Sequence, residues 1–195
     1  ARPYLNTKVE IREADLGDVA GHVERSLEAS LKRLGSDCVD ILQIHNGPTL
    51  GPPDLRLSSY FQLGMEHYLG PRGALEGLER VLRAGKARYA GFICRGNDGA
   101  EVRTLIDAGK FRLINVPYTL LNPTAGWPKP SGMVVDRDYG DVISYAHENG
   151  VGTAVFSPLV GGLLSDHRLG GGALHPLAER RAARLATEDT QLARA

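Results

Sequence analysis

The chain has 195 residues, of which 42% are hydrophobic and 24% charged, an ordinary composition for a globular protein with a sizeable core. Lys and Arg number 23 and are balanced by 23 Asp and Glu, so the formal net charge is zero. Without a basic excess to hold a phosphate backbone, nucleic acid is an unfavourable partner. No apolar run approaches the roughly 20 residues of a membrane helix, and the first residues lack the apolar core of a signal peptide. We therefore expect one domain over residues 1–195, with no membrane partner.

The cysteines and histidines predict neither a disulfide framework nor a metal site. Cys38 and Cys94 lie in apolar, strand-like segments without CxxC spacing, so we expect buried free thiols in a reducing compartment, the cytoplasm. Four histidines show no metal-ligand spacing, so we expect no metal site: His67, His147, His167 and His175.

The first half of the chain alternates between predicted strands and helices. Residues 4–9 are short and β-prone, and residues 19–34 carry apolar side chains at helical spacing. Residues 39–45 are a short apolar strand. Residues 47–73 are rich in proline and glycine, which predicts a long loop with a helical turn near residues 62–69. This loop contains three aromatic residues, Tyr60, Phe61 and Tyr68. We expect them to line an apolar substrate pocket or to form a small core of the loop itself.

The alternation continues in the second half. The predicted helices are residues 74–84, 97–108 and 138–149, and the predicted strands are residues 87–93, 111–116 and 151–156. Asn97 and Asp98 are the candidate caps of the middle helix. A Gly-rich loop over residues 157–172 and a last helix from Pro176 complete the predicted order.

Five repeats of strand and helix, with strands that are continuous apolar runs, indicate an α/β protein with a covered parallel sheet. Two architectures fit this order, an open doubly wound sheet and a (β/α) barrel. The first strand is not followed by GxGxxG, and the Gly-rich turns come late in the chain. These two features favour the barrel.

Five segments of the chain resemble the aldo/keto reductase superfamily, and they occur in the family's order. They read TKV (residues 7–9), SLEASLKRLGSDCVDILQIHN (26–46), LERVLRAGKARYAGF (78–92), FRLINVPYTLLNP (111–123) and GVGTAVFSPLVGGLLS (150–165). A single segment is only moderately specific for this superfamily, whereas five segments in the family's order are a strong signal for it. The resemblance implies a (β/α)8 TIM barrel of aldo/keto reductase type.

The resemblance places the chain at units three to seven of the eight-unit barrel. Two units would precede it and one would follow, whereas such barrels need at least about 200 residues and typically about 250. We therefore expect an incomplete barrel of about five βα units. It is a fragment, a truncated homologue, or one piece of an assembly that a partner completes.

The family resemblance also implies a chemistry. Its members transfer a hydride from NADPH to a carbonyl carbon, while a Tyr, tuned by a Lys and an Asp, protonates the oxygen and a His orients it. Lys8 and His45 match the Lys and His positions. The Asp and Tyr positions fall in the two preceding units, which this sequence does not contain. The simpler interpretations are that Lys8 is a solvated surface residue and that His45 is a hydrogen-bonded residue at the barrel rim.

The resemblance further implies a cofactor site for NADP, with NAD as the alternative. Asn115 stands where the family often carries a glutamine at a strand end, and Phe156 stands where an aromatic ring stacks on the nicotinamide. Phe156 is equally well explained as a core residue. The loop that follows supplies the remaining candidates for cofactor binding, which are Ser157, Leu159 and Gly161.

One strand tip departs from the family pattern. Where the family usually has a Ser-Asn pair to hold the nicotinamide carboxamide, this chain has Ile93 and Cys94. The Ile93 side chain can neither donate nor accept a hydrogen bond. Cys94 is also interpreted as a core thiol, and Asn97 is either a substitute contact or a helix cap.

Three functional hypotheses follow. The leading one is an NADP-dependent oxidoreductase that reduces aldehydes or ketones, or oxidises the corresponding alcohols or aldoses, with a small carbonyl compound as substrate. The second is a catalytically inactive scaffold that binds nucleotide or a protein partner. The third is a different (β/α) barrel enzyme whose strand ends match by chance.

Overall fold

The computed structural model describes residues 2–52, 61–95, 98–135, 137–160 and 164. Within these ranges five strands form one sheet in the order β1-β2-β5-β6-β7, and every neighbouring pair is parallel. The strands are β1 (Asn6–Val9), β2 (Val39–Ile44), β5 (Ala87–Ile93), β6 (Leu113–Pro117) and β7 (Gly152–Phe156). The order of the strands in space follows their order in the chain, as in a barrel, whereas a doubly wound sheet reverses direction. The predicted barrel-type parallel sheet is therefore confirmed in its five strands, and a described helix follows each of the first four.

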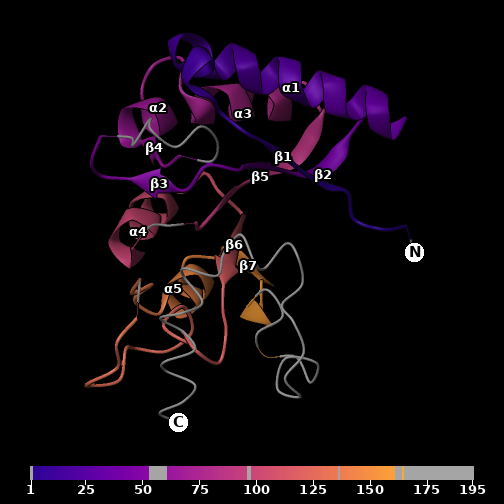
Figure 1. Cartoon of the computed structure of the whole chain (residues 1–195). Helices are drawn as coiled ribbons and strands as arrows, with labels where there is room; N and C mark the ends of the chain where they lie inside the picture. Colours follow the sequence, from indigo (N-terminus) through magenta and orange to yellow (C-terminus); the bar gives the residue numbers. More distant parts are fainter. Residues whose placement is uncertain (1, 53–60, 96–97, 136, 161–163, 165–195) are drawn as a thin grey trace, which may run out of the picture.

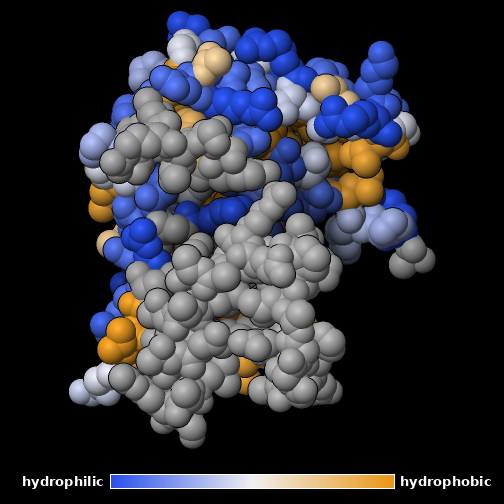
Figure 2. All heavy atoms as spheres, in the orientation of Figure 1, coloured by the Kyte–Doolittle hydropathy of each residue, from blue (hydrophilic) through white to orange (hydrophobic). Residues whose placement is uncertain are grey.

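The helices cover one face of this sheet. They are the 3-10 helix η1 (Glu13–Asp18) and the α-helices α1 (Val19–Leu34), α2 (Met65–Leu69), α3 (Ala74–Arg83), α4 (Gly99–Asp107) and α5 (Val142–Glu148). Helices α1 and α3 lie side by side over β1, β2 and β5 (Figure 1). The outer surface of α1, at the top of Figure 2, is mainly hydrophilic. No helix in the described ranges is both long and apolar enough to span a membrane.

The predicted bounds of α1 are confirmed at both ends. Val19, Val23, Leu27 and Leu31 recur on one side of the helix and are buried in the core. Gly35 ends the helix because it adopts a left-handed conformation, with φ of 61°, that other residues rarely adopt. The apolar periodicity of the sequence thus translates directly into the packing of α1 on the sheet.

Alternate residues of each strand point toward the helices. In β2 and β5 these residues are Leu42, Ile44, Ala90 and Phe92, all buried in the hydrophobic core. Phe92 packs edge-on against Phe111, with ring centroids 4.9 Å apart. The residues between them point to the opposite face, which in a barrel is the interior.

The predicted loop over residues 47–73 contains regular structure. Strands β3 (Pro48–Thr49) and β4 (Leu63–Gly64) form a small parallel sheet, and α2 confirms the predicted helical turn. Phe61 and Tyr68 are buried in the main hydrophobic core, which favours a core role over a pocket lining. Tyr60 lies outside the described residues.

Several other predicted elements differ in length or position, and the strand predicted from residue 4 begins at Asn6. The helix predicted over residues 138–149 begins only at Val142, because Asp141 adopts a left-handed conformation with φ of 54°. The strand predicted from residue 111 begins at Leu113. Helix α4 follows Asp98, whose backbone N–H donates to Glu101 Oε2 at 2.9 Å in a capping box. The helix predicted from Pro176 lies outside the described residues.

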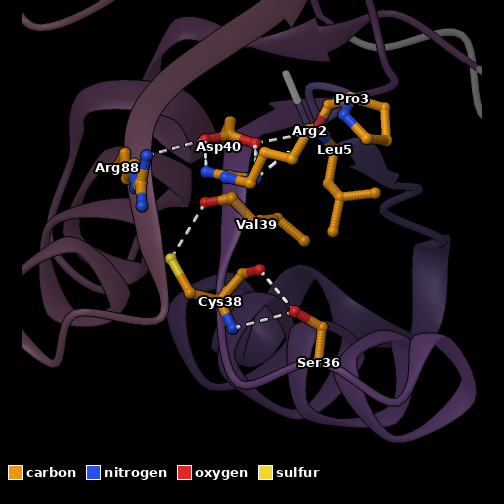
Figure 3. Close-up of polar contacts among 8 residues, drawn as sticks. All are labelled: Arg2, Pro3, Leu5, Ser36, Cys38, Val39, Asp40 and Arg88. Atoms are coloured by element: carbon orange, nitrogen blue, oxygen red, sulfur yellow. Dashed lines mark hydrogen bonds and ion pairs between the residues drawn. The ribbon is translucent and has the colours of Figure 1, made fainter.

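A charged cluster fastens the N-terminal segment to the amino end of β2 (Figure 3). Asp40, which is 1% exposed, accepts hydrogen bonds from Arg2 at 2.6 and 2.9 Å, from the Leu5 backbone at 2.9 Å and from Arg88 at 3.1 Å. The Arg2 guanidinium and the Leu5 N–H hold the pKa of Asp40 below its ordinary value. Stabilising the fold is the usual task of this end of a barrel sheet.

Both cysteines are free thiols. Cys94 is buried in the hydrophobic core, as predicted. Cys38 is only half-buried, so the prediction of a buried thiol is wrong there. The reason is its position before β2 begins, where Sγ contacts the Val39 carbonyl oxygen at 3.2 Å instead of entering the core (Figure 3).

Candidate functional site

The candidate site lies at the carboxyl ends of the parallel strands, on the face away from the helices. Strand register aligns Lys8 of β1 with Gln43 of β2, and Gln43 with Gly91 of β5. Ile93, two residues beyond Gly91, is aligned with Asn115 of β6. Because side chains alternate along a strand, these residues share the interior face. Active sites of barrel enzymes occupy this end of the sheet.

His45 continues β2 by one residue and is held by β1. Its backbone N–H donates to the Val9 carbonyl at 2.7 Å, and its side chain is half-buried. Burial lowers the pKa of His45, and the positive charges of Lys8 and Arg95 lower it further. Glu10 acts in the opposite direction. The imidazole is therefore neutral at neutral pH and can donate a hydrogen bond to a carbonyl oxygen.

Lys8 is the neighbour of His45 on the adjacent strand. Its side chain is half-buried, and its charge reaches the His45 ring strongly enough to lower the pKa of that ring. The structure thus brings together the two residues that match the family's Lys and His positions. A cation favours a neighbouring group in its anionic form.

Asn46, the next residue after His45, has a structural role that the sequence analysis did not assign. Its buried amide accepts from the Ile11 N–H at 2.8 Å and donates to the Ile11 and Phe61 carbonyls at 2.9 and 3.0 Å. The Tyr68 hydroxyl donates to the Asn46 carbonyl. Asn46 therefore ties the segment carrying His45 to the end of β1 and to the following loop. The only signal in the sequence was an amide placed directly after the candidate histidine.

The candidate cofactor residues occupy neighbouring strand ends. Asn115 is half-buried, and its Oδ1 accepts a hydrogen bond from Gln43 Nε2 at 3.1 Å. Phe156 is the last residue of β7, is half-buried, and pairs in register with Pro117 of β6. An amide and a partly accessible aromatic ring thus lie on adjacent strands of the interior face. Gln43 was not among the predicted site residues.

The chain turns sharply after Phe156. Ser157 adopts a left-handed conformation with φ of 58°, and its carbonyl accepts from the Val160 N–H at 3.0 Å. Val160 is also left-handed, with φ of 49°, which is costly for a β-branched residue. Leu159 within this turn is 54% exposed. Gly161 lies outside the described residues.

At the tip of β5, Ile93 and Cys94 present no amide or hydroxyl group, and the exposed Arg95 follows them. Ile93 is 4% exposed, and Cys94 is fully buried in the core, which agrees with its interpretation as a core thiol. Asn97, the suggested substitute, lies outside the described residues. No group of three or more His, Cys, Asp or Glu side chains within the described ranges is arranged to hold a metal ion.

Comparison with known proteins gives a consistent result. Residues 2–195 match the aldo/keto reductase family. The NADP(+) aldo-keto reductase yakc of Schizosaccharomyces pombe is 26% identical over 157 residues, which are 80% of this chain and 37% of that protein.

Solved structures show the same fold. Aldo-keto reductase AKR11C1 from Bacillus halodurans, in its holo form, matches with a TM-score of 0.58 at 20% identity, over 84% of this chain and 43% of that chain. The NADPH complex of aldo-keto reductase AKR2E5, from the silkworm Bombyx mori, matches with a TM-score of 0.51 at 21% identity, over 80% of this chain and 40% of that chain.

The chain spans between 37% and 43% of the length of these relatives. That share agrees with a five-stranded part of a barrel whose strands follow one another in chain order. The match over residues 2–195 covers nearly the whole chain. The chain belongs to the aldo/keto reductase family.

Proposed function

We propose that the protein is an NADP(H)-dependent oxidoreductase that reduces aldehydes or ketones, or oxidises the corresponding alcohols or aldoses. The observation that carries this proposal is the placement of Lys8, His45 and Asn115 on one face at one end of the sheet. That arrangement puts a cation, a neutral imidazole and an amide on the interior face of the same sheet. Membership of the family supplies the reaction class.

His45 and Lys8 have distinct tasks in this proposal. The neutral imidazole of His45 donates a hydrogen bond to the carbonyl oxygen of the substrate and orients it. The Lys8 ammonium favours the deprotonated form of a proton donor beside it, which moves the donor's pKa toward neutral pH. The family resemblance places that donor, a Tyr, and its companion Asp in barrel units outside this sequence.

The residues present fit a nicotinamide nucleotide in part. Asn115 would hold the carboxamide, Phe156 would stack on the ring, and backbone groups of the turn at Ser157 would meet the phosphates, whereas Ile93 provides no polar contact. The cofactor, when bound, supplies the hydride. NADP is preferred over NAD because the S. pombe relative is named for NADP(+) and the silkworm relative is solved with NADPH.

Free Cys38 and Cys94 favour the cytoplasm as the compartment.

Turnover of NADPH with a panel of small aldehydes and ketones tests this function. In the completed enzyme, which includes the barrel units that supply the Tyr and Asp, we expect NADPH absorbance to fall with at least one substrate, and His45→Ala to lower kcat by at least about tenfold. Asn149→Ala, at the exposed end of α5, is the matched control and should leave the rate unchanged. An undiminished rate in His45→Ala removes His45 from the mechanism.

A scaffold that binds nucleotide without turnover is the second candidate. It is favoured by the end of β5, where Ile93 and Cys94 leave no polar side chain to grip the carboxamide. The same experiment separates the two candidates. Binding of NADPH without oxidation by any compound of the panel supports the scaffold, and measurable turnover refutes it.

A further inference from the structure

Gln43 is a buried amide that reaches across a neighbouring strand. Its side chain, 0% exposed, lies on the interior face of β2. Nε2 donates to the Phe92 carbonyl of β5 at 3.2 Å and to Asn115 Oδ1 of β6 at 3.1 Å. Because β5 lies between β2 and β6, one side chain links three adjacent strands at the candidate site.

Gly91 makes this crossing sterically feasible. Gly91 lies on β5 in register with Gln43 of β2, so the Gln43 side chain passes over it to reach Asn115 of β6. A Cβ atom at Gly91 would lie 3.0 Å from Gln43 Cγ and 2.5 Å from the Leu113 carbonyl oxygen. Any side chain at this position would therefore displace Gln43 from Asn115.

The Phe92 carbonyl determines how both amides are oriented. A carbonyl oxygen only accepts hydrogen bonds, so Gln43 must direct its Nε2 toward Phe92. The second hydrogen on Nε2 meets Asn115, which must present Oδ1. Asn115 consequently turns Nδ2 away from Gln43, and within the described part of the chain its side chain has no further hydrogen-bond partner.

This arrangement leaves one buried acceptor without a donor. Gln43 Oε1 has no hydrogen-bond partner among the described residues. An unpartnered buried acceptor destabilises a fold, and an apolar side chain of similar length would avoid that cost. The amide is therefore poorly explained by stability alone, which points to a task in the site.

We propose that Gln43 is a positioning residue that holds the Asn115 amide with Nδ2 as a donor toward the site. Asn115 then recognises a carbonyl oxygen, which for a nicotinamide nucleotide is the carboxamide oxygen and not the carboxamide NH2 group. The identity of this ligand rests on the proposed function. The orientation of the Asn115 amide does not depend on the proposed function.

Hydrogen exchange of side-chain amides tests the orientation without any cofactor. In 15N-labelled protein the two amides are assigned by the signals lost in Gln43→Met and Asn115→Asp. We expect the Gln43 Nε2 hydrogens to exchange at least about tenfold more slowly than those of Asn115 Nδ2, because both of the former are bonded. Slower exchange at Asn115 than at Gln43 overturns the proposed orientation. Gln43→Met keeps the side-chain length and removes the unpartnered acceptor, so the variant should fold.

Calorimetric titration with two cofactors tests recognition. The 3-acetylpyridine analogue of NADP+ keeps the carbonyl oxygen and lacks the NH2 group, so wild-type protein should bind it within about threefold of NADP+ itself. Gln43→Met should weaken both by at least about tenfold, and Asn149→Asp, a matched amide change on α5, should weaken neither.

The outcomes are distinguishable. An analogue that binds at least about tenfold more weakly than NADP+ shows recognition of the NH2 group and overturns the proposed role of Asn115. Equal affinities in wild type and Gln43→Met overturn the positioning role of Gln43. If wild-type protein binds neither nucleotide, the proposed function fails, and amide exchange still decides the orientation.

Discussion

His45 shows how the local environment sets the chemistry of one side chain. The ring is half-buried at the end of β2, with Lys8 on the adjacent strand and Arg95 after β5. Burial and the two cations act in the same direction, so the pKa of His45 lies below the ordinary value of about 6.5. A neutral imidazole at neutral pH keeps one ring N–H that can donate a hydrogen bond.

An NMR titration of the His45 ring checks this environment. We expect a pKa below about 6.5 in the wild type and a higher value in Lys8→Met, because that change removes a lowering charge. An unchanged His45 titration in Lys8→Met would show that the two side chains are not neighbours.

The same shift fixes the sign of the dependence of stability on pH. The folded protein binds the His45 proton less readily than the unfolded chain does, so acid favours unfolding through this group. Its contribution to stability is complete above about pH 6.5 and is lost as the pH falls through the lower, folded pKa.

At the scale of elements, the contact between α1 and α3 depends on one glycine. A Cβ atom at Gly77 of α3 would lie 2.8 Å from the Ala20 carbonyl oxygen and 2.9 Å from Val23 Cβ of α1. Backbone atoms cannot move aside cheaply, so the two helices would have to separate.

We expect Gly77→Ala to lower the free energy of unfolding by about 1–3 kcal/mol, although alanine favours helices more than glycine does. Urea denaturation measures the change. Gly17→Ala is the matched control, because no atom lies within 4 Å of the added Cβ and the substitution should have little effect. A Gly77→Ala protein as stable as the wild type would mean that α1 and α3 are not in this close contact.

The elements also show what periodicity in the sequence can and cannot predict. Helix α1 and strand β5 match their predicted bounds, because each is a regular apolar pattern ended by a clear signal. Strands β3 and β4 have two residues each, too few for any period to be visible. The start of α5 is displaced by the left-handed backbone at Asp141, and nothing in its residue type requires that conformation.

The site was predictable to a similar extent. Lys8 follows from the family resemblance of residues 7–9, and His45 from its place after an apolar strand and from the same resemblance. The pairing of Gln43 with Asn115 joins residues 72 positions apart and depends on strand register and on the space above Gly91, neither of which the sequence displays. Asn46 likewise acquires its role only from the backbone groups of Ile11 and Phe61.

At the scale of the whole molecule, the two ends of the sheet carry different groups. The amino end of β2 carries the Asp40 cluster, which holds Arg2, Leu5 and Arg88 together (Figure 3). The carboxyl end carries His45, with Lys8 beside it. Such a division between a stabilising end and a reactive end is typical of (β/α) barrels.

The described sheet has two edges, β1 and β7, on either side of its five strands. A closed barrel pairs both edges, and the relatives are more than twice as long as the matched part of this chain. In the proposed enzyme, further barrel units complete the site and supply the proton donor. In that proposal, the part formed by this chain would contribute the orienting imidazole, the tuning cation and part of the cofactor surface.

The dissociation constant of NADPH, followed by nicotinamide fluorescence, decides whether this surface holds a nucleotide. We predict saturable binding to the wild-type protein, and affinities lowered by at least about tenfold in Asn115→Ala and in Phe156→Ala, because each removes a contact to the nicotinamide. Asn149→Ala should bind as the wild type does. Absence of NADPH binding, or equal binding by all four proteins, would contradict a cofactor site at the ends of β6 and β7.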